Sequence, residues 1–268
     1  MSGENSRAAV LARIAAYEAE GGEAFFRNVE DDPPSRPILP HEVDYLQKKL
    51  SSKIKTAAAS LIEQAAKHVL GRKHEITVLG GEHLAGVRGG VILTGNHFAR
   101  DESLCAKIAA ERAGRSRLYK VVREGNFFMS GIIGFLLKNC RTLPLSSNVH
   151  TMHKLDAAIA TLLKKGETIL IYPEQAMWWN YKKPRPYRIG AFHYAAKNGV
   201  PIVPYFVTLS PIEGKTDKEG YPVQRYTVHV MPPIYPDPEK TVRENARAMQ
   251  AENARLTREK YTEVYGEG

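Results

Sequence analysis

Residues 91–110 read VILTGNHFARDESLCAKIAA and contain a strand, a turn and the first turns of a helix. The short run Val91 to Thr94 is apolar and β-branched, which predicts a buried strand. A helical pattern follows it, with Leu104, Ile108 and Ala109 on one face. This strand–turn–helix unit indicates an α/β fold.

The turn of this unit carries one histidine, His97, with Asp101 and Glu102 four and five residues after it. In an open α/β sheet such a turn lies at the carboxyl ends of the strands, where ligands bind. A histidine oriented by a carboxylate is the minimal general base for activating a hydroxyl. The alternative is an ordinary helix N-terminus, where acidic side chains favour the positive end of the helix dipole.

The rest of the chain repeats the alternation of strands and helices. Strand patterns occur at 76–79, 118–122, 168–172, 200–207 and 226–230, with a short extended piece at 141–145. Helical patterns occur at 102–113, 151–165, 190–198 and 239–261. We therefore expect a mixed, partly parallel central sheet flanked by helices.

Residues 1–72 are predicted to form an N-terminal helical extension to an α/β domain at 73–268. An alanine-rich helix is expected at 7–20, then a proline-rich connector, then a long helix at 41–70. The apolar positions of this long helix are Val43, Leu46, Leu50, Ile54, Leu61 and Ile62. They either pack on the core, which is the more common outcome, or lie on a membrane surface.

The composition of the 268 residues is that of a globular protein, and the formal net charge of +9 predicts an anionic partner. No apolar run reaches the ~20 residues of a membrane span, and the first residues lack the features of a signal peptide. We therefore expect a cytoplasmic protein. Its two cysteines, Cys105 and Cys140, form neither a disulfide framework nor a metal-ligand spacing.

A second group of polar residues follows the strand at 168–172. Glu174 stands at its end, and the loop after it contains Trp178, Trp179 and four basic residues, Lys182, Lys183, Arg185 and Arg188. Such a loop suits a ligand with an anionic head and an apolar body, with the tryptophans at an interface. The alternative is an exposed basic loop whose tryptophans pack for stability.

Four motifs in order, over about residues 75–235, make the chain resemble the glycerophospholipid acyltransferase superfamily, typified by 1-acylglycerol-3-phosphate O-acyltransferase. The family's N-H-x-x-x-x-D is matched by Asn96 and His97, with Glu102 in place of the aspartate and Asp101 one residue early. A G-x-x-x-x-x-R-like block is matched by the stretch that ends at Arg141.

The third block, F-P-E-G-T-R, is matched by Tyr172, Pro173 and Glu174 and then diverges, so that Met177 replaces its arginine. The fourth, V-P-I-x-P, is matched at 200–204. The resemblance assigns the missing arginine to the phosphate of the acceptor. The basic residues of the loop at 182–188 are candidates to replace its charge.

The resemblance implies transfer of a fatty acyl group from acyl-CoA or acyl carrier protein to the hydroxyl of a lysophospholipid, a step of phospholipid biosynthesis. His97 would take the hydroxyl proton, and Glu102 or Asp101 would hold the imidazole, as a carboxylate does in a catalytic triad. Asn96 would belong to the substrate site and Glu174 would organise it, while Arg141 and the basic loop would bind the acceptor's phosphate. No metal or prosthetic group is implied.

Three alternatives stay open: a different lysolipid acceptor, a degenerate family member, and a non-enzymatic lipid- or anion-binding protein. Nucleic acid is not expected as a partner, because no nucleic-acid motif is present. Arg123 and Lys138 flank the apolar run 127–137, which is either a core helix or a contact with the anionic inner face of the cell membrane.

Overall fold

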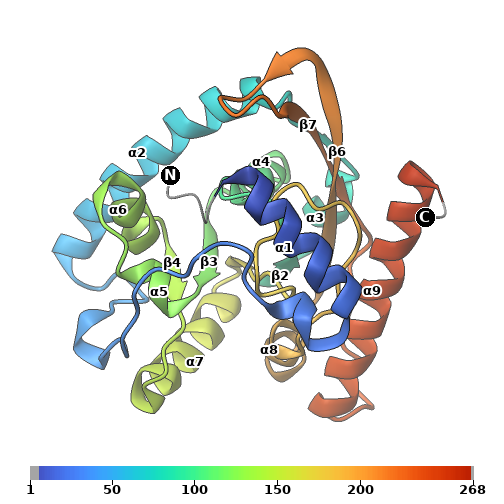
Figure 1. The fold of residues 1–268 in the computed structure, drawn as a ribbon. Coiled ribbons are helices and arrows are strands. Elements are labelled where there is room, and N and C mark those ends of the chain that lie inside the picture. Colours follow the sequence, from blue (N-terminus) through green and yellow to red (C-terminus); the bar gives the residue numbers. More distant parts are fainter. Residues whose placement is uncertain (1–5, 267–268) are drawn as a thin grey trace.

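Seven strands form one sheet in the order β1-β7-β6-β2-β5-β3-β4 in the computed structural model, which describes residues 6–266 (Figure 1). All neighbouring strands run parallel except β6 and β7. The bounds are β1 Thr77–Leu79, β2 Val91–Thr94, β3 Leu118–Val122, β4 Thr142–Pro144, β5 Thr168–Leu170, β6 Ile202–Thr216 and β7 Pro222–Val230. The expected mixed, partly parallel α/β sheet is confirmed.

Helices cover both faces of this sheet, because successive strand residues point to opposite sides. Ile92 and Ile169 face α7 (Val149–Lys164), α8 (Gly190–Asn198) and α9 (Val242–Tyr265) in one core cluster. Leu93 and Leu170 face α3 (Gly81–Ala85) and α4 (Ser103–Arg112) in a second cluster. The central strands β2 and β5 are therefore buried on both sides, as their unbroken apolar sequences indicate.

Strands β6 and β7 are longer than predicted and form a hairpin arm that extends past the other strands (Figure 1). We expected the first to end at residue 207, where its apolar run stops, but it continues to Thr216. The added residues are mostly exposed and pair only with β7. Hydrophobicity therefore did not signal them.

The N-terminal segment packs on the α/β domain beside the loop that follows β5 (Figure 1). It comprises α1 (Arg7–Glu20), η2 (Gly22–Phe26) and the connector at residues 27–38. Val10, Ile14 and Val29 form a small core with Ala176 and Trp178 of that loop. This segment therefore borders the carboxyl ends of the central strands.

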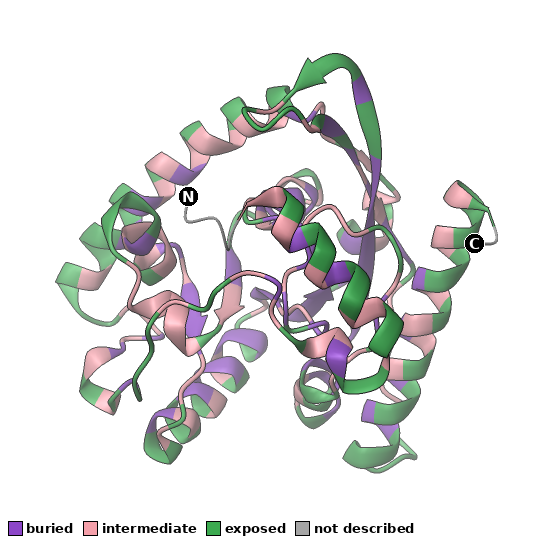
Figure 2. Ribbon diagram, in the orientation of Figure 1, coloured by how far each residue is buried: buried purple, intermediate pink, exposed green. Residues whose placement is uncertain are grey.

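The long helix predicted at 41–70 is α2, and it spans Leu50–Lys73. Residues 41–49 are not part of it, because the chain passes through the short η3 (Pro40–Glu42) and turns before the helix begins. Of its predicted apolar positions, Val43 is buried and Leu46 packs against the core, whereas Leu50, Ile54 and Leu61 do not pack on the core. The buried residues of α2 are Thr56, Ala59 and Glu63, whereas Leu50, Ile54 and Leu61 are exposed and Ile62 is half-buried. Most of α2 is accordingly exposed or half-buried in Figure 2.

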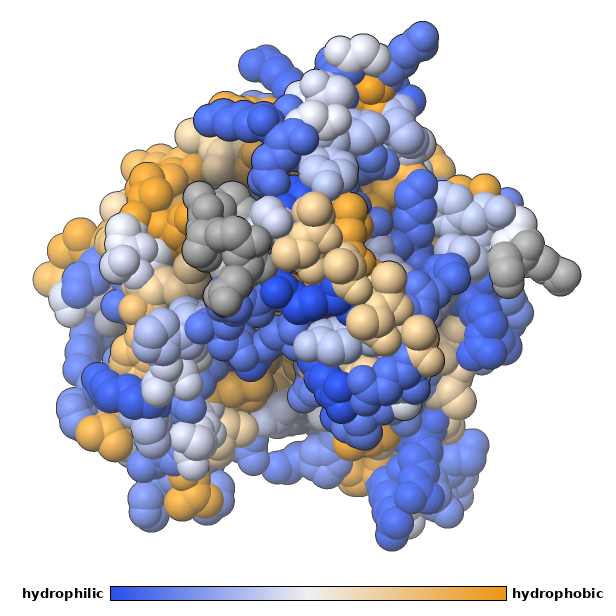
Figure 3. Space-filling model, viewed as in Figure 1, coloured by the Kyte–Doolittle hydropathy of each residue, from blue (hydrophilic) through white to orange (hydrophobic). Residues whose placement is uncertain are grey.

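These outward positions form one stripe, because Leu50, Ile54 and Leu61 recur at helical spacing and are 73%, 62% and 74% exposed. The neighbouring α6 (Gly131–Asn139) contacts α2 and adds exposed Ile132 and Ile133. Hydrophobic residues accordingly gather over α2 and α6 on the left of Figure 3. Within residues 6–266, no helix is both long and apolar enough to cross a bilayer.

Candidate active site

The centre of the site is a hydrogen bond of 2.6 Å between His97 Nδ1 and Glu102 Oε1. Gly95 to Glu102 form the turn from β2 into α4, so that Glu102 directly precedes the helix. Its other oxygen, Oε2, accepts from the backbone N–H of Ala99, and the carboxylate is only 2% exposed. In the tautomer whose Nδ1–H donates this hydrogen bond to Glu102, Nε2 keeps a free lone pair.

Asp101 does not contact His97. Its carboxylate lies 3.7 Å from Nε2 of His74, which precedes β1. Burial of His74 lowers the pKa of its imidazole, so this pair is not a strong ion pair at neutral pH. The geometry therefore decides between the two candidate carboxylates in favour of Glu102.

The plane of the His97 ring is set by stacking on Tyr172, with centroids 4.4 Å apart and planes 8° from parallel. Tyr172 in turn receives a hydrogen bond of 3.2 Å from the hydroxyl of Tyr205. Burial raises the pKa of both phenols well above its usual value, so both stay neutral. Gly95 is needed here, since a Cβ would lie 2.2 Å from the Tyr205 ring.

Asn96 holds the turn to the sheet. Its side-chain oxygen accepts from the backbone N–H of Val207 at 2.8 Å, and its amide nitrogen donates to the carbonyl of Val207 at 3.0 Å. The residue is buried, and this paired contact with β6 fixes the start of the turn that carries His97. Asn96 was predicted to bind substrate, and the structure gives it a positioning contact instead.

Glu174 and Arg185 form a buried ion pair of 2.6 Å beside the turn. Glu174 Oε2 also accepts the backbone N–H of His97 at 3.0 Å. Arg185 donates further to the carbonyls of Phe25 and Ala176, so its guanidinium is committed to internal contacts. Glu174 Oε1 is buried and has no hydrogen-bond partner in the part of the chain that the structure describes.

Trp178 does not lie at an interface. Its ring is fully buried among α1, η2 and Tyr181, and its indole N–H donates to the carbonyl of Arg27 at 3.0 Å. Its backbone N–H donates to the carbonyl of His97 at 2.9 Å, so the loop is tied to the catalytic turn. The expectation of an interfacial tryptophan is therefore wrong at this position, because the N-terminal segment covers it.

The exposed cations of the loop are held by carboxylates of the N-terminal segment. Lys183 pairs with Glu18 at 2.6 Å and Arg188 with Glu23 at 2.5 Å. Lys182 lies over the Tyr265 ring of α9, with Nζ 5.3 Å from the centroid. The predicted phosphate-binding loop is thus partly neutralised in this structure.

Two further arginines lie at the carboxyl edge, Arg100 after β2, which sequence reasoning missed, and Arg123 after β3, which it assigned to a membrane contact rather than to this site. Arg100 pairs with Glu30, and Arg123 pairs with Asp32 at 2.8 Å. Both carboxylates belong to the connector of the N-terminal segment. Only their pairing across the fold identifies these arginines, although their positions after predicted strands could have suggested them.

Arg141 does not join this site, which corrects the role predicted for it. It precedes β4, and the strand register places it level with Ile92, five residues before His97. It is also three strands away from β2, about 14 Å at the usual spacing between strands. Its guanidinium donates to Ser60 of α2 at 3.1 Å instead.

Neither cysteine is suited to nucleophilic attack. Both are buried and free, and burial raises the pKa of the Cys105 thiol well above its usual value and that of Cys140 to about 11. Within residues 6–266, no three histidine, cysteine or acidic side chains gather as a metal-binding group would.

Comparison with known proteins places this geometry in context. The family model described as Acyltransferase matches residues 75–208, half of the chain and all of the turn around His97. A crystal structure of the 1-acyl-sn-glycerophosphate (LPA) acyltransferase PlsC from Thermotoga maritima is similar in fold, with a TM-score of 0.54 and 15% sequence identity. The match covers 84% of this chain and 86% of that one. No curated protein sequence matches the chain.

Proposed function

The chain belongs to the acyltransferase family, and on that premise we propose that it transfers a fatty acyl group from a thioester to the hydroxyl of a lysophospholipid. The observation that carries the proposal is the His97–Glu102 pair at the carboxyl end of β2. The donor is acyl-CoA or acyl carrier protein, and the acceptor is 1-acylglycerol-3-phosphate or a related lysolipid. No metal or cofactor takes part in this scheme.

In the proposed reaction, His97 Nε2 removes the proton of the acceptor hydroxyl as its oxygen attacks the thioester carbonyl. The imidazolium that forms is stabilised by the buried carboxylate of Glu102. Collapse of the tetrahedral intermediate expels the thiolate, which takes the proton back from His97. No covalent acyl-enzyme is needed, in keeping with two buried cysteines of raised thiol pKa.

The acceptor's anionic group is proposed to meet Arg100 and Arg123, which follow β2 and β3 at the same edge as His97. Their partners in the N-terminal segment, Glu30 and Asp32, are carboxylates that a phosphate can replace.

We also propose that the protein works as a peripheral protein on the anionic inner face of the cell membrane, where a lysolipid would reside. The support is the exposed apolar stripe of α2, Leu50, Ile54 and Leu61, with Lys53 and Lys55 beside it. An apolar stripe flanked by lysines is typical of an interfacial helix. Ile132 and Ile133 of α6 adjoin this stripe and belong to the membrane contact predicted at 127–137. The proposed contact therefore includes α2 as well as the predicted segment.

The direct test of the chemistry is thiol release from acyl-CoA with a panel of lysolipids, comparing the wild type with His97→Ala. We expect turnover to fall by ~100-fold or more, the usual worth of a positioned base. The exposed His68→Ala on α2 is a matched control with unchanged turnover. Normal turnover in a folded His97→Ala protein, or no thiol release from any acceptor by the wild type, would reject the proposed reaction.

Membrane attachment is tested by co-flotation with vesicles of neutral and anionic lipid. Ile54→Ser and Leu61→Ser remove apolar area from the α2 stripe, and each should weaken binding without changing the unfolding midpoint, because neither side chain packs on the core. Leu11→Ser on α1 is the control, an exposed leucine outside the stripe. Equal vesicle binding by all three variants would show that the α2 stripe does not contact the membrane.

A further inference from the structure

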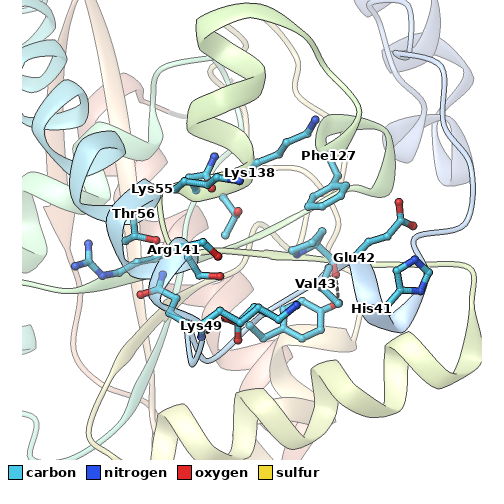
Figure 4. A pocket seen from close by; sticks show the side chains of 17 residues that line it. His41, Glu42, Val43, Lys49, Lys55, Thr56, Phe127, Lys138 and Arg141 are labelled. Atoms are coloured by element: carbon cyan, nitrogen blue, oxygen red, sulfur yellow. Dashed lines mark hydrogen bonds between the residues drawn. The ribbon is translucent and has the colours of Figure 1, made fainter.

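A cavity of about 310 Å³ lies outside the edge strand β4, away from His97 (Figure 4). It is enclosed by the first turns of α2, the segment at residues 41–49 and the last turn of α6. We name it the β4-edge pocket. Its volume lies at the lower end of the range for small-ligand sites, which begins at about 300 Å³.

The side chains around this pocket give it a positive charge. Lys49, Lys55, Lys138 and Arg141 line it, and none of their side-chain nitrogens forms a salt bridge within 4 Å of a carboxylate of residues 6–266. Figure 4 shows Lys55, Lys138 and Arg141 around the pocket, where they come from α2, α6 and the start of β4. Lys138 extends along Phe127, and the Arg141 guanidinium reaches Ser60 of α2.

The two carboxylates that also line the pocket are engaged elsewhere. Glu42 accepts from both terminal nitrogens of Arg36, at 2.6 and 2.9 Å, and from the backbone N–H of Leu39 at 2.8 Å. Asp44 accepts from the backbone N–H groups of Lys48 and Lys49, at 3.0 and 2.9 Å. Neither carboxylate forms a salt bridge with a lining lysine or Arg141, although Asp44 keeps its negative charge near Lys49.

Unpartnered hydrogen-bonding groups also line the pocket. Thr142 is 9% exposed, and its Oγ1 is buried without a hydrogen-bond partner. Arg141 Nε is likewise buried without one. In addition, α2 begins here with Lys49 at its N-cap and no side-chain cap, which leaves first-turn N–H groups in need of an acceptor. Unused donors beside a helix N-terminus are the elements of a phosphate site.

We propose that the β4-edge pocket binds a phosphate-bearing anion, and that the anion is the headgroup of a membrane phospholipid. The second part follows from position: Ser51 and Lys55 line the pocket, and their sequence neighbours Leu50 and Ile54 belong to the exposed stripe. A lipid whose phosphate occupies the pocket can leave its acyl chains against that stripe. This site is separate from the reaction at His97, because Arg141 lies three strands from β2.

The test compares Lys55→Gln with Lys53→Gln on the full chain. Both variants remove one exposed charge from α2, but only Lys55 lines the pocket. One titration uses inorganic phosphate without lipid, followed by NMR. The other uses co-flotation with phosphatidylcholine vesicles that contain phosphatidylglycerol, at about 1 M NaCl, where the Debye length falls to ~3 Å and surface attraction is screened.

We expect Lys55→Gln to weaken both phosphate and vesicle binding by about tenfold, the usual worth of a charge-assisted hydrogen bond, while Lys53→Gln changes neither by more than about threefold. Ile54→Ser should weaken vesicle binding and leave phosphate binding unchanged. Equal losses of binding for Lys53→Gln and Lys55→Gln would overturn the assignment of the β4-edge pocket as the phosphate site. If Lys55→Gln loses phosphate binding but keeps vesicle binding, the anion of this pocket is not a lipid headgroup.

Thr142→Val is a second test that leaves every charge in place. It removes the unpartnered Oγ1 and keeps the shape of the side chain. Weaker phosphate binding with an unchanged unfolding midpoint supports the pocket, whereas unchanged phosphate binding in a folded Thr142→Val protein contradicts it.

Discussion

Glu102→Gln is the substitution that examines the active-site geometry most sharply. The carboxylate lies 2.6 Å from His97 Nδ1, is 2% exposed and also accepts the N–H of Ala99. Glutamine keeps the volume and an oxygen for Ala99, so we expect the protein to fold. What it loses is the negative charge that meets the imidazolium in the transition state.

The size of the loss follows from this contact. With charge centres about 4 Å apart and an effective dielectric constant of 20, two unit charges attract by about 4 kcal/mol. One factor of ten in rate corresponds to ~1.4 kcal/mol, so turnover should fall by roughly a thousandfold. The glutamine N–H₂ also donates toward Nδ1, which favours the tautomer whose Nε2 carries the proton and cannot accept another.

Asp101→Asn is the matched control, since Asp101 is the adjacent acid and faces His74 rather than His97. We expect it to retain turnover within about threefold, as a change outside the reacting groups. The measurement is thiol release at saturating acyl-CoA, with circular dichroism to confirm folding. Comparable losses for the two variants, or near-normal turnover in Glu102→Gln, would refute the assignment of Glu102 as the partner of His97.

The remaining predictions concern the groups that hold this site. Arg185→Ala breaks the buried pair with Glu174 and should lower the free energy of unfolding, measured by urea denaturation, by about 3–5 kcal/mol. The control Arg188→Ala, at an exposed pair, should leave the urea midpoint nearly unchanged. Equal effects of the two substitutions would contradict a special contribution of the buried pair to stability. Gly95→Ala should reduce turnover by more than any loss of folded protein explains, because the added Cβ displaces Tyr205 and, through Tyr172, the His97 ring. Unchanged turnover would show that this stack does not position the base. Stability should fall as the pH drops below about 6.5, because burial lowers the native pKa of His74 and His229, so the unfolded chain binds protons that the native chain does not. His74→Gln should flatten that fall in urea midpoints measured against pH, and an unchanged pH dependence would assign it to other groups.

The sequence by itself determined the order of the elements and the place of the catalytic turn. Unbroken β-branched runs such as 91–94 predict strands buried on both faces, and these strands are parallel and central in the structure. The change from these apolar residues to the polar ones that follow them predicts a turn after the strand. His97 and its nearby acids were therefore visible before any packing was known.

The choice between Asp101 and Glu102 required the tertiary structure. The two are adjacent in sequence, and only the curvature of the turn directs Glu102 to His97 and Asp101 to His74. Arg141 shows the same limit, because a match to a motif does not reveal the register of the strand that follows. It lies level with Ile92, and its side chain faces α2.

Long-range packing also decided which faces are buried. The hydrophobic periodicity of α2 identifies an apolar stripe, but not whether that stripe meets the core or the outside. Trp178 is covered by α1 and the connector, which are about 150 residues away along the chain, and Lys183 and Arg188 of the basic loop pair with carboxylates of the same N-terminal segment. Local propensity and periodicity act over a few residues, whereas burial and charge pairing depend on segments that only the folded chain brings together.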